Sequence, residues 1–223
     1  MEEQMNLNTF EFSSGALEYF LREAFASLWH RLKAQSDPYL VFEDLLAHYR
    51  EAHRHYHTET HLAFCLAAYN EIRKHLKNPL EVEMAIFLHD VIYQPGELDN
   101  EEKSTKYAAE LLGKMGLPIE VCARICNLIL ATKHDQDPEK IMDNDTRYML
   151  DIDLRWMGTD PERFEKNTLR IRREFSHLSD QDFDSGRRAF YRMFLDRSSI
   201  FCTEYFGKKF EQQARENLER LVS

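Results

Sequence analysis

Apolar residues recur along the chain at the spacing of an α-helix. Between Thr58 and Leu76 they follow one another at steps of three, one, three, three and four residues, which lines one helical face. These residues are Leu62, Cys65, Leu66, Tyr69, Ile72 and Leu76. The same period predicts helices over about 14–34, 38–54, 58–76, 80–90, 100–115, 118–134, 143–158, 161–177, 180–198 and 201–221.

Helix-breaking residues separate these segments. They are Asn78-Pro79, Gln94-Pro95-Gly96, Gly116-Leu117-Pro118 and Asp137-Pro138. Asp99-Asn100 followed by Glu101-Glu102 is typical of a helix start, because acidic side chains favour the first turn. Glycine (7) and proline (6) are scarce among 223 residues, and no segment alternates like a strand. We therefore expect an all-α helical bundle, with 1–223 as a single domain.

Charge and composition narrow the classes of partner. A formal net charge of -10 argues against nucleic acid as the main partner, because binding its backbone needs a basic surface. A small phosphate ester stays compatible, since a bound metal reverses the local field. No apolar run reaches the roughly 18 residues of a membrane span, and the polar opening MEEQMNLNTF does not resemble a signal peptide. The four cysteines form no CxxC pair, so we expect packed, reduced thiols in a cytoplasmic protein.

Histidines are concentrated in one short stretch. Five of the ten fall between residues 48 and 61. His57 and His61 are four apart, so on a helix they share one face. For an isolated pair, half-buried histidines beside the core are the more common outcome, and a metal site is the alternative.

The segment MAIFLHD (84–90) ends an apolar run abruptly in His89-Asp90. An ionised aspartate at the end of a core helix is unfavourable unless it is paired, hydrogen-bonded or bound to a metal. The alternative is a helix end at which polar residues simply return to the surface.

The segment RYMLDIDLRWMG (147–158) holds two acids, Asp151 and Asp153, which point in roughly opposite directions on a helix. Asp151 has Arg147 and Arg155 four residues to either side, which predicts an exposed charged face. Asp153 instead lies among apolar residues, namely Met149, Leu150, Trp156 and Met157. Its charge needs a buried partner, and the spacing therefore selects Asp153 as the candidate ligand. Histidine and carboxylate donors suit Mn, Fe, Co, Ni or Zn, and the absence of thiolates argues against a structural zinc site.

Four stretches, in the order H…HD…D, resemble the HD superfamily of metal-dependent phosphohydrolases, in particular a bacterial branch of predicted HD phosphohydrolases. They are YHTETHL (56–62), FLHDVIYQPGELDNEEKS (87–104), LILATKHD (128–135) and LDIDLRWMG (150–158). The resemblance covers about 50–200 and implies an HD-type helical core there. It also implies His61, His89, Asp90 and Asp153 as the ligands of a divalent metal ion.

The resemblance further suggests catalytic roles. YHTETHL is similar to the YHNxxH segment of cyclic-nucleotide phosphodiesterases, which implies His57 as proton donor to the leaving oxygen, although Thr58 replaces the asparagine. Other HD nucleotidases carry a glutamate shortly after the HD pair. Here Glu101 or Glu102 is the candidate for that carboxylate, with solvated first-turn acids as the alternative.

Lys133 and His134 follow the apolar run 128–131. His134 is a candidate for binding a second metal or the phosphate. Lys133 is a candidate phosphate contact, with a solvated lysine at a helix C-terminus as the alternative.

The expected function is hydrolysis of a small phosphate ester, a nucleotide being one candidate, by metal-activated water with help from protonated His57. One alternative is a di-iron oxygenase of the HD fold, for which His134 is a ready extra ligand. Another is a non-catalytic metal- or nucleotide-binding protein. The metal (Mn, Fe, Co, Ni, Zn or Mg) and the oligomeric state, a homodimer included, stay open.

Overall fold

The structure, a computed structural model, describes residues 14–34, 37–136 and 138–222. This part of the chain is all-α, as predicted, and contains no strand. Its α-helices are α1 (Ser14–Arg31), α2 (Pro38–Tyr49), α3 (Glu59–Ile72), α4 (Pro79–Leu88), α5 (Asn100–Lys114), α6 (Ile119–Ala131), α7 (Asn144–Leu154), α8 (Pro161–Glu174), α9 (Asp180–Leu195) and α10 (Glu204–Val222). Short 3-10 helices are η2 (Arg73–His75), η3 (Pro138–Lys140) and η4 (Arg155–Gly158). The predicted break at Asp137-Pro138 falls partly outside the described residues.

Each predicted helix corresponds to one observed helix, but several end earlier than the apolar period does. The apolar period predicts helices that reach residues 34 and 177, whereas α1 ends at Arg31 and α8 ends at Glu174. The reason is packing, because Leu32 and Leu178 lie beyond these helix ends and still contact the core. An apolar period therefore marks burial, and burial extends into the turn that follows a helix.

Polar side chains fix where five of the helices begin. A side-chain oxygen accepts a hydrogen bond from a backbone N–H of the first turn in each case, and so satisfies a donor that the helix itself leaves unpaired. The capping residues are Asp37, Thr58, Asp143, Asp160 and Ser179. Thr58 and Asp143 matter most for function, because they set the start of α3 and α7.

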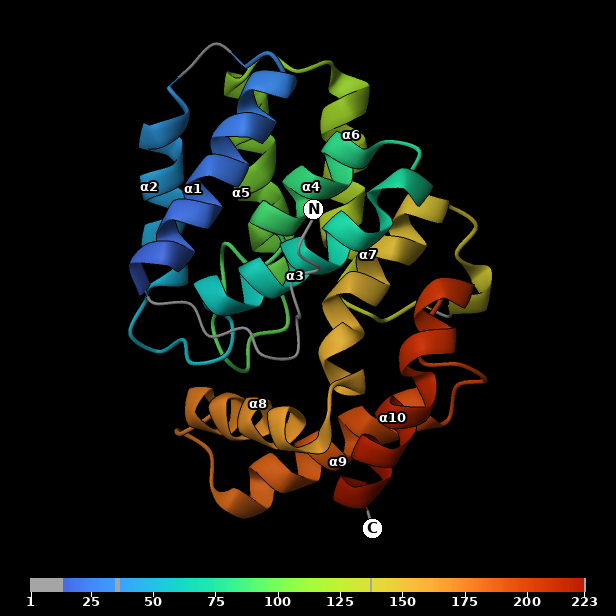
Figure 1. Ribbon diagram of the computed structural model, residues 1–223. Helices are drawn as coiled ribbons and strands as arrows, with labels where there is room; N and C mark the ends of the chain where they lie inside the picture. Colours follow the sequence, from blue (N-terminus) through green and yellow to red (C-terminus); the bar gives the residue numbers. More distant parts are fainter. Residues whose placement is uncertain (1–13, 35–36, 137, 223) are drawn as a thin grey trace.

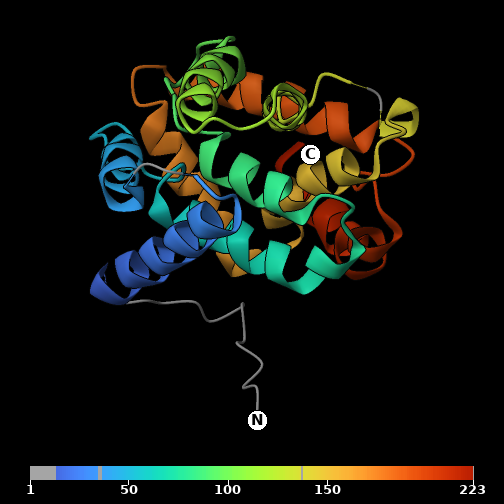
Figure 2. The ribbon, with the colours of Figure 1, turned by 90° about the horizontal axis from the view of Figure 1, so that it is seen from above.

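Helix α4 forms the centre of the bundle. It contacts α1, α3, α5, α6 and α7, and the view in Figure 2 shows it enclosed by them. All side chains from Glu81 to Leu88 are buried. The two acids among them are paired, Glu81 with Arg124 and Glu83 with Arg31. Its apolar side chains belong to one cluster that includes residues of all ten α-helices.

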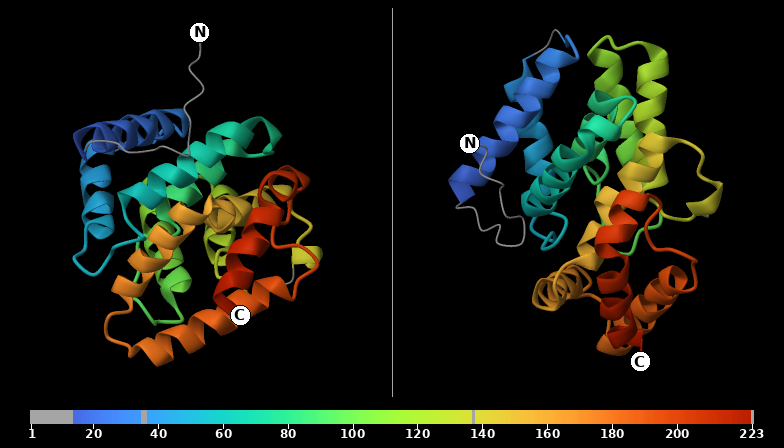
Figure 3. Two further views of the ribbon diagram at one scale, coloured as in Figure 1. Left: turned by 60° about the horizontal axis from the view of Figure 1, so that its bottom comes forward. Right: turned by 45° about the vertical axis from the view of Figure 1, so that its right-hand side comes forward.

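Helix α7 connects two groups of helices. Figure 1 shows α1 to α6 in the upper part of the picture and α8 to α10 in the lower part, with α7 running from one to the other. The right-hand view of Figure 3 shows α1 and α2 on one side of α3, with α5 and α6 on the other. Because α7 contacts α3, α4 and α6, while η4 contacts α8 and α10, residues just before and after 154 face different parts of the bundle. None of the helices in the described part of the chain combines the length and apolar character that a membrane crossing requires.

The prediction that Asp151 lies on an exposed charged face is wrong. Asp151 is completely buried, and its carboxylate accepts hydrogen bonds from the backbone of Cys202 (2.6 Å) and from the backbone and hydroxyl of Thr203 (2.8 and 2.6 Å). These groups precede α10, so Asp151 fixes the entry to that helix. Arg155 is buried as well and pairs with Glu71. Spacing along α7 could not reveal this, because the covering segment is about fifty residues away in sequence.

Candidate metal centre

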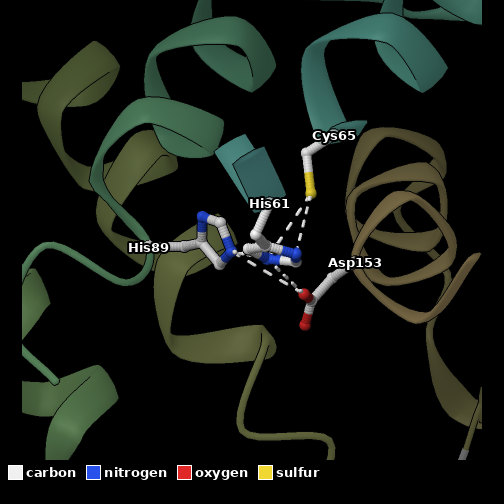
Figure 4. A group of neighbouring side chains, drawn as sticks. All are labelled: His61, Cys65, His89 and Asp153. Carbon is white, nitrogen blue, oxygen red and sulfur yellow. Dashed lines mark hydrogen bonds and ion pairs between the residues drawn. The ribbon is translucent and has the colours of Figure 1, made fainter. Parts of the chain in front are cut away.

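The four predicted ligands converge on one point. His61 comes from the first turn of α3, His89 and Asp90 from the end of α4, and Asp153 from α7. The Nε2 atoms of His61 and His89 lie 3.3 Å apart. Oδ2 of Asp90 lies 3.5 and 3.1 Å from these two nitrogens, and Oδ1 of Asp153 lies 3.4 and 3.7 Å from them. Figure 4 shows His61, His89 and Asp153 pointing toward one another.

Local structure orients each imidazole. His89 is the C-cap residue of α4, and its Nδ1 lies 2.8 Å from the carbonyl oxygen of Ile86. That carbonyl accepts the Nδ1 proton, so Nε2 is the nitrogen that faces the centre. Thr58 starts α3, so His61 lies in its first turn with its ring buried. The backbone thus aims both Nε2 atoms inward.

Both carboxylate oxygens of Asp153 face histidines of the site. While Oδ1 faces His61, Oδ2 lies 2.8 Å from Nε2 of His134. His134 is buried and has a left-handed backbone with a φ of 55°, which is uncommon for a residue other than glycine. The structure therefore brings His134 to a metal-ligand candidate, and the contact with Asp153 orients its ring.

Opposite charges hold these side chains together. Burial raises the pKa of Asp90, but the charge of His89 outweighs it and lowers this pKa far below the ordinary value. Burial also opposes ionisation of Asp153, yet hydrogen bonds from His134, His61 and His89 lower its pKa. Both aspartates are therefore carboxylates at neutral pH, which is the form that binds a cation.

The donor set fits a divalent ion. Oδ2 of Asp90 is buried and makes no hydrogen bond to any described residue. A buried carboxylate oxygen without a hydrogen bond is unfavourable unless a positive group completes it. Two imidazole nitrogens with carboxylate oxygens are ligands that suit Mn, Fe, Co, Ni or Zn.

A thiol lies beside the centre, which the sequence analysis did not anticipate. The sulfur of Cys65 is 3.6 Å from Nε2 of His61, one helical turn earlier on α3 (Figure 4). His61, Cys65, His89 and Asp153 could together hold a metal ion. Burial, reinforced by the charges of Asp153 and Asp90, raises the pKa of this thiol well above its ordinary value. Cys65 is thus a neutral neighbour of His61, and the two aspartates are the better anionic donors.

His57 lies at the edge of the centre with a partner that the sequence analysis missed. Its Nδ1 is 2.8 Å from Oε2 of Glu174, on α8. Oε1 of Glu174 accepts hydrogen bonds from the backbone N–H groups of His55, Tyr56 and His57, at 2.7 to 2.9 Å. The Tyr93 hydroxyl donates to Oε2 at 3.0 Å. Burial lowers the pKa of His57, but the charge of Glu174 outweighs this and raises it above the ordinary value.

Arg54 is a second positioning residue that was missed. Its side chain is fully buried and donates to the carbonyl oxygens of Asp90 (2.7 Å), Val91 (3.0 Å) and His57 (3.3 Å). It therefore ties the loop that carries His57 to the HD pair. The sequence of the histidine-rich loop that contains Arg54 gives no signal that this arginine positions His57 and the HD pair. Glu174 did give one, because it lies three residues after Ile171 and four before Leu178, on the apolar face of its helix.

A cavity of about 480 Å³ adjoins the centre, and Asp90, Asp153, His57 and His134 are among its lining residues. This volume is typical of small-molecule sites. Another cavity, of about 300 Å³, is lined by Arg31 and Glu83, which pair with each other. We therefore place the candidate chemistry in the larger cavity.

Of the remaining predicted site residues, some line this cavity and one does not. Glu101 lines it, and burial, with a contribution from the charge of Asp90, raises the pKa of this carboxyl. Glu102 is exposed, does not line the cavity and forms an ion pair with Lys133. Lys133 lines the cavity with its charge already paired. Of the two acids, the structure brings only Glu101 to the site.

No protein-family profile, no curated protein and no solved structure matches the chain.

Proposed function

We propose that the protein is a metal-dependent phosphohydrolase that acts on a small phosphate ester. The observation that supports this most is the meeting of four donor atoms beside the cavity. The Nε2 atoms of His61 and His89 lie 3.3 Å apart, and an oxygen of Asp90 and one of Asp153 each lie 3.1 to 3.7 Å from them. A buried carboxylate oxygen without a hydrogen bond lies among them. Three helices supply these atoms, so the arrangement does not follow from one local motif.

In this proposal His61, His89, Asp90 and Asp153 hold the ion. When bound, a divalent ion supplies an acidified water as nucleophile and polarises a phosphoryl oxygen. His134 orients Asp153 through its second carboxylate oxygen. Arg54 holds the backbone of Asp90 in place through its carbonyl oxygen.

His57 is the proposed proton donor. Its Nδ1 faces Glu174, so its Nε2 is the nitrogen left for a substrate in the cavity that His57 lines. The raised pKa of His57 favours the protonated ring. The imidazolium then gives the Nε2 proton to the oxygen of the departing alcohol, while Glu174 stabilises the charge. Glu101, which also lines the cavity, is the proposed further carboxylate, and its raised pKa suits proton transfer.

A substrate screen tests the proposal. Purified full-length protein is supplied with Mn, Mg, Co or Ni and assayed against phosphomonoesters, cyclic nucleotides and nucleoside triphosphates. We expect metal-dependent release of phosphate or of a phosphate monoester. We also expect His57→Gln to lower kcat by about 10²- to 10⁴-fold while the bound metal is retained.

Three outcomes would overturn it. Metal-loaded protein that hydrolyses no class of ester would contradict a phosphohydrolase. Product that forms only with iron and oxygen would point to the oxygenase alternative. Binding of metal and nucleotide without turnover would point to a binding protein.

A further inference from the structure

Arg187, on α9, lies at the cavity with unused hydrogen-bonding capacity. It lines the cavity together with Asp90 and Asp153. Among the described residues its guanidinium makes one hydrogen bond, to the hydroxyl of Tyr191 at 2.9 Å, and its Nε is buried without a partner. A guanidinium has five N–H donors, so most of this capacity is free for another group.

Aromatic rings fix the position of this cation. Its Cζ lies 4.6 Å from the ring centroid of Tyr191, 4.8 Å from that of Phe190 and 5.9 Å from that of Trp156. Such contacts hold a guanidinium without neutralising it. Tyr93, whose hydroxyl donates to Glu174, lines the same cavity as Arg187. Arg187 is therefore close to the residues that hold His57.

The other charged residues of the cavity wall determine whether Arg187 is free to bind an anion. The cavity is lined by the acids Asp90, Glu97, Glu101, Asp153 and Asp182 and by two fixed cations, Lys133 and Arg187. Lys133 is paired with Glu102. In the proposed function Asp90 and Asp153 neutralise the metal ion. Arg187 is then the lining cation, among the described residues, whose charge no carboxylate neutralises.

Part of the cavity wall is apolar and aromatic. Phe175, Phe183 and Phe190 line the cavity, together with Leu178 and Ile171. Phe175 and Phe183 have ring centroids 5.8 Å apart, so they form a continuous aromatic surface between α8 and α9. Such a surface favours a flat ring over a hydrated chain.

We propose that Arg187 is the specificity-determining residue of this site, and that the substrate is a phosphate ester of an alcohol carrying an aromatic ring. Arg187 donates hydrogen bonds to an anionic oxygen of the substrate, and the ring lies against Phe175, Phe183 and Phe190. This assignment rests on the proposed function, but it concerns binding and can be tested without turnover.

The test uses three probes on the full chain with its bound metal. Benzylphosphonate has the charge and the ring but no ester bond. Methylphosphonate has only the charge, and benzyl alcohol has only the ring. Dissociation constants are measured by titration calorimetry, and we expect benzylphosphonate to bind at least about tenfold more tightly than either other probe.

Variants at residues of α9 separate the contribution of the cation from that of the aromatic wall. Arg187→Met should weaken binding of both phosphonates by about 10- to 100-fold, as expected for charge-assisted hydrogen bonds, and should leave benzyl alcohol unchanged. Arg187→Lys keeps the charge and should recover part of the loss. It also tests the assignment if Arg187→Met folds poorly. Arg188→Met removes an exposed neighbouring arginine and should bind like the wild type. Phe190→Leu should reduce the advantage of benzylphosphonate over methylphosphonate.

Two results would overturn the assignment. One is benzylphosphonate binding no more tightly than methylphosphonate. The other is an Arg187→Met or Arg187→Lys variant that binds the phosphonates as the wild type does. Because the probes contain no ester, a protein that binds them as expected but hydrolyses nothing would contradict the proposed function and leave the assignment of Arg187 standing.

Discussion

Oδ2 of Asp153 lies 2.8 Å from Nε2 of His134, while its Oδ1 lies 3.4 Å from Nε2 of His61. One carboxylate thus faces the candidate metal centre with one oxygen and a positioning residue with the other. Partners of this kind fix the orientation of a ligand and raise the affinity for the ion.

His134→Asn tests this relationship, since asparagine tolerates the left-handed backbone at this position. We expect metal affinity to fall by about 10- to 100-fold, because Asp153 loses its orienting contact. Competition with a chelator measures the change. His177→Asn, at an exposed histidine, is the control and should keep wild-type affinity. Unchanged affinity in His134→Asn would show that Asp153 needs no such partner.

Asp151 and Asp153 of α7 should respond differently to substitution by asparagine. Asp153→Asn should lose the metal and stay folded. Asp151→Asn should keep the metal but lower the free energy of unfolding by about 1–3 kcal/mol, because an amide nitrogen would face donors at Cys202 and Thr203. Elemental analysis and thermal unfolding of both variants distinguish the outcomes. Loss of metal in a stably folded Asp151→Asn protein would reverse the assignment.

The Glu174–His57 pair should make stability depend on pH. Burial raises the pKa of Glu174, but the charge and hydrogen bond of His57 lower it from 4.5 to about 2, so its contribution is lost as pH falls toward that value. The pKa of His57 is raised from 6.5, so its contribution is complete below 6.5 and lost as pH rises through the raised value. The shift of Glu174 from 4.5 to about 2 corresponds to about 3 kcal/mol of stability.

The measurement is the difference in Tm between wild type and Glu174→Gln across pH. We expect the largest difference between pH 4.5 and 6.5, with decreases toward pH 2 and into the alkaline range. Other groups titrate equally in both proteins and cancel in the difference. A difference that stays constant from pH 5 to pH 9 would be incompatible with an ionised pair.

A close approach between η4 and α10 gives a stability prediction. A Cβ added at Gly158 would lie 2.6 Å from Cβ of Phe210, whereas one added at Gly113 on α5 would meet nothing within 4 Å. Gly158→Ala should therefore destabilise the fold by about 1–3 kcal/mol. Gly113→Ala should stabilise it by about 0.5–1 kcal/mol, since alanine favours a helix. Denaturant unfolding of the two variants compares them, and equal stabilities would exclude this docking of α10.

Periodicity was enough to predict the helices because each buries an apolar face, and that face is visible in the order of residues. The same rule placed Asp153 toward the interior, since it stands among apolar neighbours. It failed for Asp151, whose neighbours Arg147 and Arg155 indicated a surface. Both arginines contact the C-terminal segment instead, Arg147 through the Cys202 carbonyl oxygen and Arg155 over the ring of Phe210.

Long-range partners account for the other residues that were missed. Glu174 meets the His57 backbone across 117 residues, and Arg54 meets Asp90 across 36. Neither pairing follows from spacing within one helix, because it depends on how α8 and α4 pack near the loop before α3. Cys65 was treated as an apolar residue of α3, although its position one turn after His61 brings its sulfur to the same centre.

The most direct test of the central claim is the metal content of Asp90→Ala. Full-length wild type and variant are purified alike, loaded with Mn, Co or Zn, dialysed and measured by elemental analysis, with Asp99→Ala as a control at an exposed acid. We expect wild type and Asp99→Ala to retain the ion, and folded Asp90→Ala to lose it together with any ester hydrolysis. A folded Asp90→Ala protein that holds as much metal as the wild type would contradict the proposed centre.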